Sequence, residues 1–130
     1  MITSDHNALD GEAISFAVEA ARLAEDLHCT DVRVLDVRGL SQVCDFVLLA
    51  SGTSDRQSRS VASEFEDLAK TYGLVRLHST RDEASTWTLV DFASVVAHIF
   101  EPSRRAYYDL EDLWHDAPEI DFVRDQENAS

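Results

Sequence analysis

The stretch DFVLLASGTSDRQ, residues 45–57, decides the fold, because it joins an apolar strand to a helix through a turn of small residues. The run CDFVLLA (44–50) is almost continuously apolar, which is typical of a strand that is covered on both faces of a sheet. Ser54 and Gln57 then fit a capping box, in which a hydroxyl and an amide each satisfy a free backbone N–H at a helix start. The stretch therefore predicts a strand, a turn and a capped helix, and such a turn also favours anions.

The residues on either side predict the rest of the fold. Apolar residues recur at helical spacing from Val61 to Tyr72, and Gly73 ends this helix. An earlier helix is predicted to begin at a cap formed by Asp10, and one or two short helices follow Ser103. Four further strand-like runs occupy residues 31–37, 74–79, 87–92 and 95–100. This order predicts an α/β fold with a mixed five-stranded sheet flanked by helices, in which the second helix is a right-handed crossover between two parallel strands.

Length and composition predict one soluble domain. The chain has 130 residues, of which 45% are hydrophobic and 28% charged, as in ordinary globular proteins. We assign residues 1–116 to the single domain and 117–130 to an acidic, flexible tail. No apolar stretch approaches the roughly 20 residues of a membrane span, and the N-terminus lacks the pattern of a secretory signal. We therefore expect a cytoplasmic protein with no membrane contact, in which Cys29 and Cys44 are reduced thiols.

Charge is the strongest bulk signal. The chain has 25 acidic and 11 basic residues, which give a formal net charge of −14. Affinity for nucleic acid comes from Lys and Arg that neutralise phosphates, so binding to free nucleic acid is not expected. A basic protein partner fits the charge, because complementary potentials speed encounter. Solubility alone explains the acidity at least as well.

The turn from Ser51 to Gln57 raises the alternative of a phosphate- or nucleotide-binding enzyme. A Walker loop ends in Gly-Lys-Ser/Thr, whereas Asp55 here repels a phosphate, and a Rossmann fingerprint needs three spaced glycines where only Gly52 is present. Nucleotidyl transfer needs two carboxylates one residue apart on a strand, and no predicted strand has them. His98 is more typical of a hydrogen-bonded buried histidine than of a metal ligand. We therefore predict no catalytic residues, no metal and no cofactor, with the enzyme kept as the alternative.

The C-terminal third is rich in residue types that dominate protein interfaces. Trp, Tyr and Arg bury a large area and keep a polar handle. The Trp, Tyr and Arg residues of this region, together with the Phe and His residues near them in the sequence, are Trp87, Phe92, His98, Phe100, Arg104, Arg105, Tyr107, Tyr108 and Trp114. Core packing explains Phe92 and Tyr108 as well as binding does. Trp87 is the strongest candidate, because it starts a strand directly after a polar loop, where an aromatic ring is often only half covered.

Five segments together resemble the ribosomal silencing factors, also called the Iojap family. They are LDVRGLS (35–41), DFVLLASGTSDRQ (45–57), W-x-L-x-D-F (87–92), VVAHIF (95–100) and R-x-Y-Y-D-L-E-D-L-W (105–114). Each segment is weak evidence by itself. Their order and separations make the set highly specific, and it extends from about Asp31 to Trp114.

The resemblance implies a fold similar in outline to nucleotidyltransferases but without their catalytic carboxylates. It also implies a non-enzymatic activity: the protein binds the large ribosomal subunit through its universal protein number fourteen and sterically blocks joining of the small subunit, which represses translation under nutrient limitation. A homodimer is left open. The partner-binding residues that the resemblance implies are Trp87, Asp91, His98, Phe100, Arg105, Glu111 and Trp114, with Tyr108 and Leu110 structural.

The chain departs from the family pattern beside this implied docking surface. It has STRDEAS (79–85) where the family often has Glu-Gly before the tryptophan strand, and Ser94 where a second acid is common. VVAH also replaces the usual VVVH. We expect these differences to alter contact details.

Overall fold

Strand β2 (Phe46–Ser51) is the buried strand that the opening stretch predicts, and all six of its residues are buried. The computed structural model describes residues 2–82, 86–103, 105 and 109–123. Strand β2 pairs antiparallel with β1 (Thr30–Asp36) and parallel with β5 (Val95–Phe100). Alternate residues of β2 join two different apolar clusters, one on each face of the sheet, so the continuous apolar run reflects burial on both faces.

The remaining strands complete the mixed sheet that the sequence predicts. Strand β4 (Trp87–Asp91) pairs antiparallel with β5, and β3 (His78–Arg81) pairs antiparallel with β4. The strand order is β1-β2-β5-β4-β3. Helix α2 (Asp55–Thr71) connects β2 to β3, and the pairings make these two strands run in the same direction, although two other strands lie between them.

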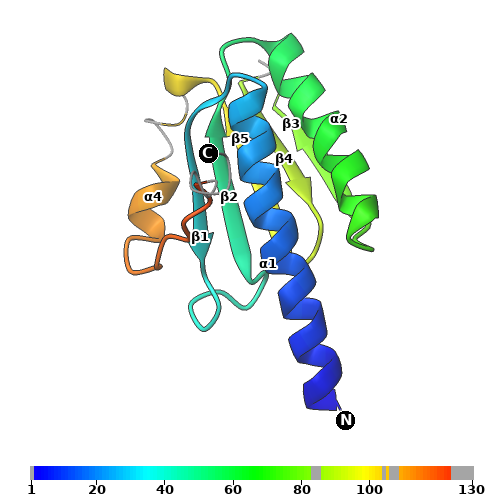
Figure 1. Ribbon diagram of the computed structural model, residues 1–130. Helices are drawn as coiled ribbons and strands as arrows, with labels where there is room; N and C mark the ends of the chain where they lie inside the picture. Colours follow the sequence, from blue (N-terminus) through cyan, green and yellow to red (C-terminus); the bar gives the residue numbers. More distant parts are fainter. Residues whose placement is uncertain (1, 83–85, 104, 106–108, 124–130) are drawn as a thin grey trace, which may run out of the picture.

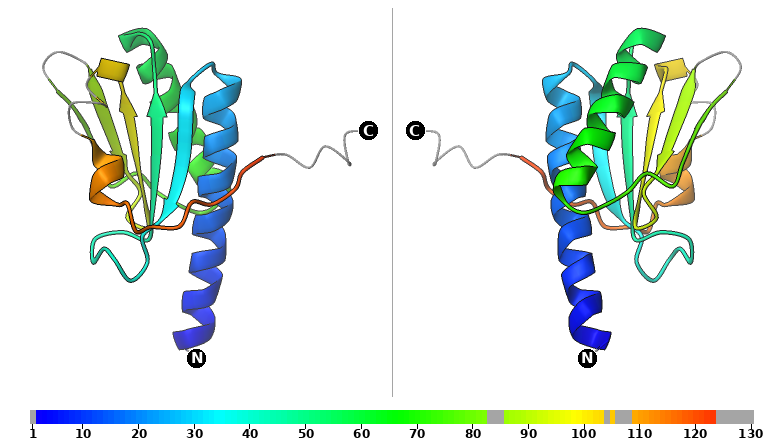
Figure 2. Two further views of the ribbon diagram at one scale, coloured as in Figure 1. Left: turned by 90° about the vertical axis from the view of Figure 1, so that its left-hand side faces the viewer. Right: turned by 90° about the vertical axis from the view of Figure 1, so that its right-hand side faces the viewer.

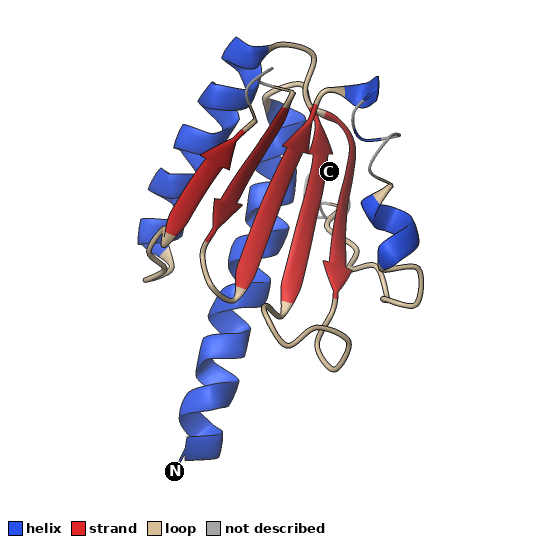
Figure 3. Cartoon of the chain, turned by 180° about the vertical axis from the view of Figure 1, so that it is seen from behind, coloured by secondary structure: helices blue, strands red, loops and turns tan. Residues whose placement is uncertain are grey.

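Two helices cover only one face of this sheet (Figures 1 and 2). Helix α1 (Ile2–Asp26) and α2 pack their apolar sides on the larger core cluster. The phenylalanines and tyrosines in this cluster and at its partly buried margin are Phe16, Phe46, Phe65, Tyr72, Phe92 and Phe122. The opposite face, seen in Figure 3, carries the smaller cluster and is covered in part by α4 (Leu110–Leu113). We call this second side the open face. In the described part of the chain, no helix combines the length and apolar character that a membrane span requires.

The turn between β2 and α2 differs in one detail from the predicted capping box. Ser54 is the N-cap, and its hydroxyl accepts a hydrogen bond from the Gln57 backbone N–H at 3.0 Å. The Gln57 side chain does not return to Ser54; its Oε1 accepts from the Thr53 N–H at 2.6 Å, and its Nε2 donates to the Leu27 carbonyl at 2.9 Å. Gln57 therefore ties the turn to the end of α1 as well as capping the helix.

Two predicted boundaries are wrong. Helix α1 begins at Ile2 and not at Asp10. The strand predicted at 74–79 is β3 at His78–Arg81, because the Leu74 N–H instead bonds the Ala69 carbonyl at the end of α2. The apolar residues before β3 do not mark a buried strand, since Val75 and Leu77 are exposed. The helix α2 does end where Gly73 adopts a φ of 73°.

Part of the predicted flexible tail is fixed to the sheet. The Asp36 N–H bonds the Pro118 carbonyl at 2.9 Å, and the Ile120 N–H bonds the Val34 carbonyl at 2.8 Å. Arg22 of α1 donates to the Phe122 carbonyl at 2.7 Å. Residues 118–122 thus lie along β1, whose outer edge otherwise offers unpaired backbone groups. Residues 124–130 lie outside the described part of the chain.

Candidate functional site

An aromatic row crosses the open face at the end of β4 and β5. The β4–β5 register places Trp87 opposite Phe100 and Leu89 opposite His98. The Trp87 ring stacks on Phe100 with centroids 5.5 Å apart and on His98 with centroids 5.9 Å apart. Trp87 is half-buried, whereas Phe100 is 1% exposed. The indole is therefore the accessible end of a packed row, as the position of Trp87 after a polar loop predicts.

His98 fixes the orientation of that indole. Trp87 Nε1–H donates a hydrogen bond to His98 Nδ1 at 3.2 Å. This bond requires an unprotonated Nδ1, so the imidazole is neutral and carries its proton on Nε2. Burial lowers the pKa of His98 to about 4, which keeps the ring neutral at ordinary pH. His98 is thus a hydrogen-bonded buried histidine, and the sequence-based interpretation of it is confirmed.

Asp91 lies at the other end of β4. Its Oδ1 accepts a hydrogen bond from the Ala93 N–H at 2.7 Å, and Ala93 has a φ of 70°. The carboxylate therefore organises the turn into β5. It also lines a hollow of about 340 Å³ on the open face, whose other described walls are His78, Thr80, Asp82, Trp87 and Leu89. We call this the β3–β4 hollow.

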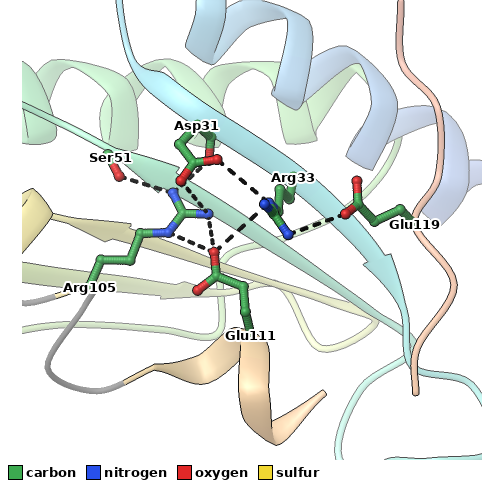
Figure 4. Close-up of polar contacts among 6 residues, drawn as sticks. All are labelled: Asp31, Arg33, Ser51, Arg105, Glu111 and Glu119. Atoms are coloured by element: carbon green, nitrogen blue, oxygen red, sulfur yellow. Dashed lines mark hydrogen bonds and ion pairs between the residues drawn. The ribbon is translucent and has the colours of Figure 1, made fainter. Parts of the chain in front are cut away.

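Arg105 and Glu111 form an ion pair inside the C-terminal segment (Figure 4). The Arg105 side chain is 6% exposed, and its Nε and Nη2 donate to Glu111 Oε2 at 2.9 and 2.5 Å. Nη1 donates to the Asp31 carbonyl at 2.5 Å and to Ser51 Oγ at 2.9 Å, while the Asp31 carboxylate lies 3.7 Å from Nη2. Arg105 therefore joins the start of β1, the end of β2 and α4.

Arg33 extends this cluster to the segment that follows α4. Its guanidinium lies 3.9 Å from Glu111, 3.5 Å from Asp31 and 3.3 Å from Glu119 (Figure 4). We call Asp31, Arg33, Arg105, Glu111 and Glu119 the ionic clasp. Its contacting residues are as far as 74 and 86 positions apart in the sequence, so no local pattern could have indicated the ionic clasp.

Trp114 follows α4 and packs against the smaller core cluster while remaining half-buried. It lines a second hollow of about 270 Å³ on the open face, together with Val43, Cys44, Val47, Leu113 and His98 among others. We call this the α4 hollow. Because Glu111 belongs to α4, the ionic clasp holds this wall of the hollow against the sheet.

The turn from Ser51 to Gln57 is filled by its own side chains. Gln57 Oε1 accepts from both the backbone N–H and the hydroxyl of Thr53. A Cβ on Gly52 would lie 3.0 Å from Ser58 Oγ and 3.2 Å from Gln57 Oε1. Asp55 lies beside the turn, where a carboxylate disfavours a phosphate. Among the described residues, no group of three His, Cys, Asp or Glu side chains could hold a metal ion.

Comparison with known proteins resolves which family this arrangement belongs to. A sequence profile described as "Ribosomal silencing factor during starvation" matches residues 10–130. The chain belongs to the ribosomal silencing factor family. It is 41% identical over 110 residues to the ribosomal silencing factor RsfS of Bacillus subtilis, covering 82% of this chain and 92% of that protein. It is also 38% identical to the chloroplastic protein Iojap of Arabidopsis thaliana, covering 86% of this chain and 47% of that longer protein.

Solved structures agree with this membership. A crystal structure of a Chromobacterium violaceum protein superposes with a TM-score of 0.71 at 31% identity, covering 88% of this chain and 92% of that one. One from Bacillus halodurans gives 0.68 at 32% identity, covering 85% and 98%. The resemblance and the mixed α/β fold are thus confirmed. Membership places the silencing factor in translation regulation and in association with ribosomes.

The seven site residues that the sequence implied fall into two groups in this silencing factor. Trp87, Asp91 and Trp114 are half-buried on the open face. His98, Phe100 and Arg105 are buried beneath or beside it, and Glu111 pairs with Arg105. Arg104, Tyr107, Tyr108 and the Leu110 side chain lie outside what the structure describes, as do residues 83–85 of the departing loop.

Sequence reasoning missed two exposed apolar residues beside the α4 hollow. Val43 is 80% exposed and Leu113 is 65% exposed. Val43 lies between two segments that carry the family resemblance, and Leu113 lies inside another, but the sequence pattern predicts only an ordinary loop residue and an ordinary helix residue at these positions. Their exposure on one face becomes visible only when the β1–β2 connection and α4 are placed side by side.

Proposed function

We propose that this silencing factor binds the large ribosomal subunit in the cytoplasm through its universal protein number fourteen and thereby blocks joining of the small subunit. The observation that carries the proposal is the half-buried indole of Trp87, held rigid by His98 and Phe100 on a sheet face that α4 covers only in part. A preorganised aromatic side chain loses little conformational freedom on binding, which is why such residues dominate interfaces.

The charge of the chain supports a basic partner. A formal net charge of −14 attracts a basic ribosomal protein over a distance of about a Debye length, roughly 8–10 Å at physiological salt. The same charge disfavours binding to exposed ribosomal RNA alone. A protein contact on the ribosome therefore fits this surface better than a direct RNA contact.

The proposed mechanism needs no chemical step. A factor seated on the face of the large subunit that meets the small subunit represses translation by occupying that space. In this proposal Trp87, Asp91 and Trp114 contact the partner. His98, Phe100, Arg105 and Glu111 act indirectly, since they hold Trp87 and α4 in place.

Replacing Trp87 with alanine tests the proposal. We expect the affinity for purified large subunits to fall by about 2 kcal/mol, or roughly thirtyfold, because an interface anchor is removed. Trp87→Phe keeps an aromatic ring in the stack but loses the N–H and part of the ring area, so it serves as the conservative control and should retain more of the affinity than Trp87→Ala. Circular dichroism shows whether each variant is folded. Unchanged affinity of a folded Trp87→Ala variant would contradict the assignment.

A second measurement separates binding from exclusion. Purified large and small subunits are mixed with excess factor, and joining is followed by sucrose-gradient sedimentation. The proposal expects separate subunits and the factor bound to the large one. Large subunits that lack protein fourteen should not bind the factor. Normal joining with the factor bound would contradict steric exclusion.

A further inference from the structure

The open face has two hollows, and the aromatic row separates them. The β3–β4 hollow is lined by residues of β3 and β4, including Trp87. The α4 hollow is lined by Val47 of β2, by His98 of β5, and by the segments around Val43 and Trp114. Because Trp87 stacks on His98, the two hollows lie on either side of one side-chain pair. Neighbouring strands are about 4.8 Å apart, and two such spacings lie between the β3–β4 pair and the β2–β5 pair, so the hollows are about 10 Å apart measured across the strands.

The α4 hollow is suited to an apolar side chain. Its rim includes Val43 and Leu113, which are 80% and 65% exposed. Its floor includes Val47 and the buried Cys44. Exposed apolar side chains around an apolar hollow are typical of a surface that another protein covers. The volumes of about 270 and 340 Å³ each accommodate one large apolar side chain.

The charged residues that line the β3–β4 hollow are acidic. Asp82 and Asp91 line the β3–β4 hollow, and none of the described residues lining either hollow is Lys or Arg. Burial is the main cause that raises the pKa of the Cys44 thiol, and the charges of Asp45 and Asp91 raise it further, so their negative potential reaches the α4 hollow. Arg81 of β3 lies 3.9 Å from Asp55 of α2, on the helix-covered side.

We infer that the open face binds a basic protein segment that presents two apolar side chains about 10 Å apart, one for each hollow. This inference rests on the proposed function, because the segment is assigned to the ribosomal partner. It adds Val43, Leu113 and the β1–β2 connection to the docking surface. A second copy of this chain fits less well, since two bodies of net charge −14 repel each other and would bring acidic rims together.

The apolar part of the inference is tested with Val43→Glu. The new carboxylate adds negative charge, which favours a basic partner, but it must lose its hydration at the mouth of an apolar hollow. We expect the affinity for purified large subunits to fall about tenfold or more. Val75→Glu is the matched control, because Val75 is 71% exposed and lies away from both hollows. Its affinity should stay within about twofold of the parent chain.

The charged part is tested with Asp91→Asn. Asparagine can still accept the hydrogen bond from the Ala93 N–H, so the turn is kept while the charge is removed. We expect weaker binding at low salt and a shallower dependence of affinity on salt concentration. Asp67→Asn is the control, because Asp67 lies on the exposed side of α2.

The outcomes distinguish failure of the inference from failure of the proposed function. If the parent chain does not bind large subunits, the proposed function fails and the inference falls with it. If the parent chain binds and Trp87→Ala weakens binding, but Val43→Glu matches Val75→Glu, the inference alone is overturned. If Val43→Glu abolishes a dimer in light scattering and leaves subunit binding unchanged, the α4 hollow belongs to a second copy and the inference is again overturned.

Discussion

Replacing Arg105 with methionine removes the cation at the centre of the ionic clasp. Methionine fills much of the same space and is apolar, so the change leaves Glu111 and Asp31 without the guanidinium that they share. Deleting one partner of a buried ion pair typically costs about 3–5 kcal/mol, because the remaining charge is left uncompensated. The side chains of Glu111 and Asp31 are 24% and 57% exposed and can recover water, and Arg33 stays 3.9 and 3.5 Å from them, which favours the lower end of that range. We therefore expect the free energy of unfolding to fall by about 3 kcal/mol.

The expected loss is measured by urea unfolding at 25 °C, followed by circular dichroism and tryptophan fluorescence. With a slope of about 2 kcal/mol per molar urea, the midpoint should shift down by about 1.5 M. Arg56→Met is the matched control, because Arg56 is exposed on α2, and we expect its free energy of unfolding to stay within about 0.5 kcal/mol.

A double variant separates the ion pair from other effects of Arg105. Arg105→Met with Glu111→Met removes both charges, and an apolar replacement of a buried pair is often neutral. We expect the double variant to be more stable than Arg105→Met alone, which appears as a coupling energy in the double-mutant cycle. The reasoning is refuted if Arg105→Met costs less than about 1 kcal/mol, or if the double variant is no more stable than the single one.

Four further substitutions test local features of the fold. Burial lowers the pKa of His98 from 6.5 to about 4 in the folded chain, so the unfolded chain binds more protons between these two pH values. About 3 kcal/mol of the stability that is present above pH 6.5 should therefore be lost as the pH falls towards 4. His98→Gln should make the melting temperature depend less on pH in this range. Gly52→Ala should cost about 1 kcal/mol in urea unfolding, because its Cβ meets Ser58 Oγ at 3.0 Å, whereas Gly11→Ala in open space on α1 should stabilise by about 0.5–1 kcal/mol. Ser54→Ala should cost about 1 kcal/mol by the same assay, since it removes the N-cap of α2, and an unchanged midpoint would contradict that role.

Local sequence patterns predicted the centre of the fold because they have local causes. The apolar run that forms β2 and the cap at Ser54 each depend on a few adjacent residues. The strand predicted at 74–79 failed because Val75 and Leu77 are apolar but exposed. The pattern of apolar residues indicates burial only where another part of the chain covers them, and adjacent residues do not carry that information.

The candidate site, too, could be predicted from the sequence only where its causes are local. The position of Trp87 after a polar loop predicted its partial exposure, and strand pairing then brings His98 and Phe100 beside it. The roles of Arg105 and Glu111 could not be read from the C-terminal motif, because their partners lie at the start of β1 and the end of β2. Resemblance identified these residues, whereas the contacts show that they hold α4 against the sheet.

The dependence of binding on salt concentration distinguishes the two partners that could cover the open face, a second copy of this chain and a basic ribosomal protein. Two copies of a chain with net charge −14 repel each other, and this repulsion weakens as the Debye length falls from about 10 Å at 0.1 M salt to about 3 Å at 1 M. Attraction to a basic ribosomal protein weakens over the same range. Raising potassium chloride at fixed magnesium should therefore reduce the affinity for large subunits, measured by fluorescence anisotropy, and increase any self-association, measured by light scattering. If subunit binding instead strengthened with salt, apolar contact alone would govern docking, and the acidic rim formed by Asp82 and Asp91 would have no part in choosing the partner.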